Sequence, residues 1–103
     1  MNNKMLSLLG IARRAGRLSL GHDAVIQSIV ENRAKLCICA EDASQRLQNE
    51  VAHACGFDNK NIPFCVPECS AEQLSKAVGQ KVSVLSVDDE GFAAAITKTT
   101  EEG

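Results

Sequence analysis

Apolar residues recur along this chain in two spacings, one helical and one strand-like, and the two alternate from end to end. A first helix is predicted over Lys4–Ala15, because its apolar residues repeat at helical spacing. These residues are Met5, Leu8, Leu9 and Ala12. Gly16 is placed to end this helix in a left-handed turn. Short apolar runs bounded by turn residues predict four strands, at Leu18–Leu20, Leu36–Ala40, Ile62–Val66 and Val82–Val87.

The second predicted helix covers His22–Glu31 and is amphipathic. The residues expected on its core-facing stripe are Val25, Ile26, Ile29 and Val30. The residues expected to face solvent are Gln27, Ser28 and Glu31.

End signals mark the next two helices. Asp42 or Ser44 is placed to cap a third helix, which Gly56 ends. Ser70 followed by Gln73 at the third position beyond it is a capping box. A short fourth helix is therefore predicted between Ser70 and Gly79.

The C-terminal segment opens with three acidic residues, Asp88–Glu90. Negative charge stabilises the start of a helix, so we interpret this trio as the beginning of a last helix that reaches about Ile96. The polar residues Thr97–Gly103 are expected to form a frayed tail.

The order of these elements predicts the fold class. Leu36–Ala40 shows no polar alternation, which is typical of a strand covered on both faces. Strict alternation of helices and strands predicts an α/β fold, a three-layer α-β-α sandwich around a four-stranded mixed sheet. At 103 residues, we expect one domain over residues 1–103.

Composition indicates an ordinary globular protein, with 45% hydrophobic and 23% charged residues. We expect a cytoplasmic location, because no apolar run is long enough to cross a membrane and the N-terminus lacks the layout of a signal peptide. Five cysteines are present, but their spacings match no zinc pattern. We interpret them as small core residues, with neither disulfides nor a metal.

Charge is distributed unevenly. The net charge is −2, which argues against a generic nucleic-acid or DNA binder. Residues 1–35 carry six basic and two acidic side chains, whereas residues 36–103 carry five basic and eleven acidic ones. An anionic partner is therefore expected to meet the first third of the chain. The basic residues in question are Arg13, Arg14, Arg17, Arg33 and Lys35; the first three also suit the end of a helix.

Recognised catalytic motifs are missing. The chain has no P-loop, no dinucleotide-binding fingerprint, no nucleophile elbow and no H-E-x-x-H. We therefore expect no catalytic residues, no cofactor and no enzymatic activity. The place suited to a ligand is the junction at Gly21, where a helix start offers unpaired N–H groups beside His22, Asp23 and Gln27.

The run Gly21–Ser44 resembles the ribosomal protein family of large-subunit proteins seven-Ae and thirty-e, and particularly its small stand-alone bacterial members. Ile62–Phe64, Leu74–Gly79 and Asp88–Ala93 match it as well. The resemblance covers essentially the whole chain. It implies a non-catalytic protein that binds kink-turn or related internal-loop RNA, such as ribosomal RNA, with ribosomal or assembly proteins as further partners.

The resemblance also implies which residues touch RNA. In the family, a glycine, an Asn, a Glu and a Lys near the start of the second helix make contacts, and here those positions hold Gly21, Asp23, Ala24 and Gln27. The second contact region corresponds to Val66–Ser70. The complete expected set is Gly21, His22, Asp23, Ala24, Gln27, Glu68, Cys69 and Ser70, with the five basic residues above in support.

Four departures from the family pattern weaken that expectation, and one of them is the negative charge that Glu68 places in the second contact region. Asp23 accepts hydrogen bonds but cannot donate as Asn does, and Ala24 lacks a carboxylate. Gln27 lacks the charge that would meet a phosphate. We therefore expect weak or altered RNA recognition.

Two other functions stay open at this point. One is a protein-interaction or assembly module that keeps the fold and has lost kink-turn binding. The other is a small-molecule binder or enzyme that uses the Gly21 junction as an anion site.

Overall fold

Four strands form one mixed sheet in the computed structural model, which describes residues 3–102. The strands are β1 (Leu18–Leu20), β2 (Leu36–Cys39), β3 (Phe64–Cys65) and β4 (Val84–Val87). Their spatial order is β1-β4-β2-β3. β4 runs antiparallel to both of its neighbours, whereas β2 and β3 are parallel. The predicted mixed sheet is confirmed.

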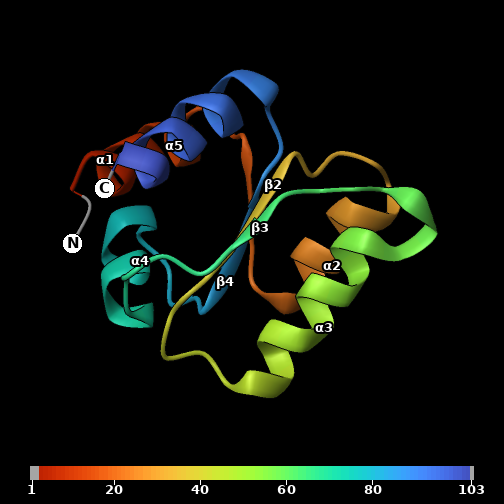
Figure 1. Ribbon diagram of the computed structural model, residues 1–103. Coiled ribbons are helices and arrows are strands. Elements are labelled where there is room, and N and C mark those ends of the chain that lie inside the picture. The colour runs from red at the N-terminus through yellow and green to blue at the C-terminus, as the bar shows by residue number, and fades with distance from the viewer. Residues whose placement is uncertain (1–2, 103) are drawn as a thin grey trace.

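Helices cover both faces of this sheet, which confirms the three-layer sandwich (Figure 1). They are α1 (Asn3–Arg14), α2 (His22–Val30), α3 (Gln45–Gly56), α4 (Ala71–Val78) and α5 (Glu90–Glu102), with a short 3-10 turn, η1 (Phe57–Asn59). α2 and α3 pack together on one face, and α1 packs with α4 and α5 on the other. Among residues 3–102, none of the helices has the length and apolar character needed to cross a membrane.

The core lies in two layers on either side of β2 and β4, whose residues are all buried. Leu36 and Ile38 join the cluster beneath α1, α4 and α5, and Cys37 and Cys39 join the cluster beneath α2 and α3. Successive strand residues point to opposite faces, so an uninterrupted apolar strand fills both layers. Cys37 and Cys39 are fully buried, as expected of small core residues.

Helix caps agree in part with the sequence signals. Ser44 caps α3 by accepting from the Leu47 N–H, and Ser70 with Gln73 forms the predicted capping box of α4. Asp42, however, caps a different helix from the one expected. Its Oδ1 accepts from the N–H of Ala71 at 2.8 Å, and it therefore ties the loop after β2 to the start of α4.

Two expectations about helices are wrong. Residues 97–102 are not a frayed tail, because α5 continues through Glu102 and buries Thr99; Gly103 lies outside the described residues. On α2, Val25 and Ile29 are buried and Gln27 and Glu31 are exposed as predicted, but Ser28 is fully buried and Val30 is 62% exposed, against the prediction. Ser28 can be buried because the Asp88 carboxylate accepts from its hydroxyl at 2.7 Å.

Candidate functional site

The carboxyl ends of β1, β2 and β3 lie at one end of the sheet. Leu20 pairs with Leu85, Cys39 with Val84 and Cys65 with Ile38, so each of these three strands leaves the sheet on the side where β4 enters it. The segments that follow them are Gly21–Ala24, Glu41–Ser44 and Val66–Ser70. We call these three segments together the Gly21 end of the molecule.

Backbone hydrogen bonds join these three segments across the sheet. Gly21 N–H donates to the Val84 carbonyl at 3.0 Å, and Ala40 N–H donates to the Ser83 carbonyl at 2.9 Å. Glu41 N–H donates to the Cys69 carbonyl at 2.9 Å. Three strand spacings separate β1 from β3, roughly 14 Å. The two regions expected to contact RNA therefore share one surface, with the loop after β2 between them.

Gly21 sets the shape of the helix start. Its φ of 90° and ψ of 163° belong to a region that only glycine adopts without strain, and no side chain caps the helix there. The N–H groups of His22, Asp23 and Ala24 precede the first intrahelical bond, which Val25 donates to the Gly21 carbonyl. A Cβ built at Gly21 meets nothing within 4 Å, so the backbone here is open to a ligand.

The side chains around this start are polar and partly engaged. His22 Nε2 lies 3.0 Å from Glu50 Oε2 on α3, and its Nδ1 lies 3.4 Å from Asp23 Oδ1. The Gln27 amide donates to Glu31, and this hydrogen bond is the largest cause that lowers the pKa of the Glu31 carboxyl. Gln27 is therefore turned along the helix toward its C-terminal end. Asp23 is fully exposed, and Ala24 is half-buried.

Fewer side chains of the Val66–Ser70 segment are available to RNA than the resemblance implies. Glu68 is exposed and Val66 is 39% exposed. Cys69 is 1% exposed and belongs to the core cluster beneath α1, α4 and α5, so its thiol does not reach the surface. The hydroxyl of Ser70 accepts from the Gln73 N–H as part of the helix cap. The exposed surface of this loop is therefore formed by Val66 and Glu68.

The five basic residues are not brought to this end. Arg17 directly precedes β1 and Lys35 directly precedes β2, and the strand register sets both opposite Asp88 at the far end of β4. Arg33 Nη1 lies 3.6 Å from Asp88 Oδ2, and Arg13 and Arg14 end α1 shortly before Arg17. The positive charge expected near Gly21 therefore lies about one strand length from it, because Arg17 and Lys35 enter β1 and β2 at the opposite end of the sheet.

Acidic side chains instead surround the Gly21 end. They are Asp23, Glu41, Asp42, Glu50 and Glu68. Glu50 accepts from Arg46 Nε at 3.1 Å and also faces His22, so it links the two helices on that side. Sequence reasoning missed Glu50. The feature that could have identified Glu50 is its position in the first half of α3, the helix that packs on α2.

Comparison with known proteins shows similarity over most of the chain. A family model described as ribosomal protein L7Ae/L30e/S12e/Gadd45 matches residues 3–97. The chain is 37% identical over 87 residues to the RNA-binding protein YlxQ of Bacillus subtilis (strain 168), a match that covers 84% of each chain. It is 31% identical over 100 residues to the RNA-binding protein YlxQ of Enterococcus faecium, covering 97% of this chain and 93% of the relative.

Solved structures show the same fold. A protein of unknown function from Bacillus halodurans superposes with a TM-score of 0.88 at 29% identity, covering 95% of this chain and 97% of that one. A Giardia lamblia 15.5kD RNA binding protein superposes with a TM-score of 0.74 at 16% identity, covering 97% and 84%; at that identity the likeness shows the fold alone. The family match, the two relatives and the shared fold agree, and the chain belongs to the ribosomal protein L7Ae/L30e/S12e/Gadd45 family.

Proposed function

We propose that this chain is a non-catalytic RNA-binding protein that docks its Gly21 end against kink-turn or related internal-loop RNA. The observation that carries the proposal is the open start of α2, which lies on the same surface as the Val66–Ser70 segment. Two relatives whose names describe them as RNA-binding proteins support it. An internal loop supplies the unpaired, splayed bases that proteins read on RNA.

The chemistry of this surface favours base edges over phosphates. Carboxylates at Asp23 and Glu68 accept hydrogen bonds from the amino groups of bases, and the N–H groups at the start of α2 donate to acceptors. The same carboxylates repel the RNA backbone, so few phosphates are neutralised at this end. Weak binding with a shallow dependence on salt follows from this arrangement.

The test is a titration with two RNAs that share one strand. One carries a kink-turn, and in the other the same strand is fully paired. Tighter binding to the kink-turn RNA supports the proposal, whereas equal affinity for both RNAs, or no binding to either, rejects it. Ribosomal RNA is the first natural RNA to test for a kink-turn that this protein binds.

Because all five cysteines are free thiols, we also propose that the protein works in the cytoplasm.

The acidic character of the Gly21 end supports a second candidate function. Three carboxylates at this end would attract a basic ribosomal or assembly protein, and the same charges repel the RNA backbone. They belong to Glu41, Asp42 and Glu50. In that case the chain is an interaction module that keeps the family fold. A protein that co-purifies after nuclease treatment, and is lost when Glu41 and Glu50 are both changed to Gln, would favour this candidate.

A further inference from the structure

Positive charge gathers at the end of the sheet opposite Gly21. Arg17 and Lys35 flank Asp88 on its two sides, at the carboxyl end of β4, roughly 10 Å apart. Arg33 reaches Asp88, and Lys60 lines the same groove as Lys35. Arg13 and Arg14 end α1 shortly before Arg17. We call these six residues the basic end. All except Lys60 are exposed.

Asp88, Asp89 and Glu31 accept from protein donors at this end, whereas Glu90 is exposed beside Lys35. Asp88 is nearly buried and accepts from the hydroxyls of Ser19 at 2.6 Å and Ser28 at 2.7 Å. Arg33 Nε donates to Glu31 at 2.8 Å, so this guanidinium neutralises Glu31 and Asp88 together. Within residues 3–102, neither Arg17 nor Lys35 forms an ion pair through its side chain. Their charges are therefore available to an anion in solution.

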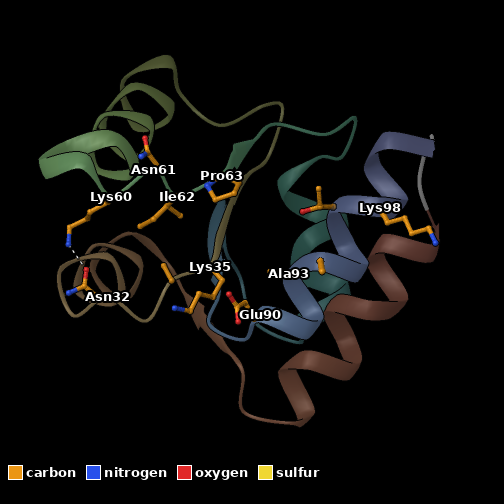
Figure 2. A pocket seen from close by; sticks show the side chains of 12 residues that line it. Asn32, Lys35, Lys60, Asn61, Ile62, Pro63, Glu90, Ala93 and Lys98 are labelled. Carbon is orange, nitrogen blue, oxygen red and sulfur yellow. Dashed lines mark hydrogen bonds between the residues drawn. The ribbon is translucent and has the colours of Figure 1, made fainter.

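A groove of about 630 Å³ opens beside Lys35 (Figure 2). One wall carries Lys60, whose Nζ donates to Asn32 Oδ1 at 2.7 Å, and the other wall is α5. Pro63 and Ala93 also line this groove. Lys35 and Glu90 lie next to each other in this view, and Lys60 and Lys98 come from its two sides.

We propose that the basic end is a second RNA-binding surface, which contacts backbone phosphates in a duplex arm of the same RNA whose internal loop docks at the Gly21 end. Arg17 lies four residues before Gly21, a distance of roughly 13 Å along β1. A duplex arm that leaves the internal loop therefore needs to extend only a short distance to reach the basic end. Arginine and lysine at a surface neutralise phosphates without reading sequence. The inference rests on the proposed function and gives each end a different role. The Gly21 end contacts bases, and the basic end attracts the RNA backbone.

The experiment pairs two RNAs with two double variants. Both RNAs contain the same kink-turn, but one has a long flanking duplex arm and the other has its arms cut to the minimum. Arg17→Gln with Lys35→Gln removes charge from the basic end. Lys4→Gln with Lys76→Gln removes the same charge from exposed positions on α1 and α4, and serves as the matched control.

On the long-arm RNA, we expect the Arg17→Gln/Lys35→Gln protein to bind about tenfold more weakly at low salt, and the slope of log affinity against log salt to fall by about 2. The short-arm RNA should bind this variant and the unmodified protein equally, and the control should match the unmodified protein on both. Melting temperatures identify any variant that has lost its fold.

Two results would overturn the inference. One is equal affinity of the Arg17→Gln/Lys35→Gln protein and the unmodified protein for the long-arm RNA. The other is an equal loss on both RNAs, which would place the effect at the internal loop. Failure of the unmodified protein to distinguish the kink-turn from the paired strand is a separate result, and it rejects the proposed function as well.

Discussion

At the scale of single residues, Asp88 joins segments that lie far apart in the sequence. Its carboxylate accepts from Ser19 on β1, Ser28 on α2 and Ser86 on β4, at 2.6, 2.7 and 2.8 Å. Its backbone N–H donates to the Arg17 carbonyl. This one side chain therefore fixes α2 relative to the sheet, and with it the position of the Gly21 junction.

Replacing Asp88 by Asn should lower the free energy of unfolding by about 1–3 kcal/mol, because hydroxyl donors to a nearly buried carboxylate lose the charged acceptor. Urea unfolding measures the change. Asp58→Asn is the control, since Asp58 is exposed and has a φ of 57°, which Asn tolerates. An unchanged midpoint for the Asp88 variant would show that the serine contacts contribute nothing net.

Gln27 is where a change of one residue should strengthen RNA binding. Gln27→Lys adds a positive charge on the exposed face of α2, near the proposed RNA surface. We expect about tenfold tighter binding to a kink-turn RNA and a steeper salt dependence by about 1, because the lysine meets a phosphate. Ser7→Lys, on the exposed face of α1, adds the same charge elsewhere as a control. Equal gains from both variants would mean that the effect is one of net charge.

At the scale of elements, the start of α2 depends on the conformation of Gly21. Gly21→Ala should destabilise the protein by about 1–3 kcal/mol through backbone strain alone, because the added Cβ has open space around it. Gly56→Ala also places its Cβ in open space, but at a φ of −97°, so it should be neutral or slightly stabilising. Thermal melts of the two variants measure the difference. Similar melting temperatures would contradict the role given to Gly21.

Much of the element order follows from patterns that are local in the sequence. β1 was predicted at its observed bounds, since Leu18 and Leu20 alternate with Ser19 and Gly21 follows directly. The capping box at Ser70 and the left-handed turn at Gly16 are confirmed for the same reason. Such signals need only a few neighbouring residues to be read.

The errors occur where a distant residue decides. Ser28 is buried because Asp88 reaches it across 60 residues of sequence, and Asp42 caps a helix that begins 29 residues later. β3 is shorter than predicted, and the backbone of Pro63 before it lacks an N–H for the ladder. The spacing of apolar residues within a short stretch of sequence carries no information about such distant partners.

At the scale of the whole molecule, charge is separated between the two ends of the sheet. The sequence shows that residues 1–35 are basic, yet it could not show that Arg17, Arg33 and Lys35 lie at the end of the sheet opposite Gly21. The two segments of the candidate site could therefore be predicted from the sequence. The distribution of charge around them could not. Strand order and register decide which loops meet, and both depend on the complete fold.

Buried thiols should make the folded state sensitive to alkaline pH. Burial raises the pKa of Cys39 and of Cys65 from 9.0 to about 11. A thiol whose pKa is raised by folding adds stability below its unfolded value, and that stability is lost as the pH rises through the folded value. Unfolding free energy measured in urea should therefore decline between about pH 9 and pH 11. A shallower decline in Cys65→Ala would attribute part of it to this residue, and a flat profile would contradict the account.

The most direct test of the account is to locate the RNA on the protein. Backbone amide signals of the isotope-labelled protein are followed by NMR during titration with a kink-turn RNA whose arms are minimal. The account predicts that the largest changes occur at the amides of His22–Ala24, Val66 and Glu68, with little change at Arg17 and Lys35. Changes confined to other surfaces, with these amides unmoved at saturation, would contradict it.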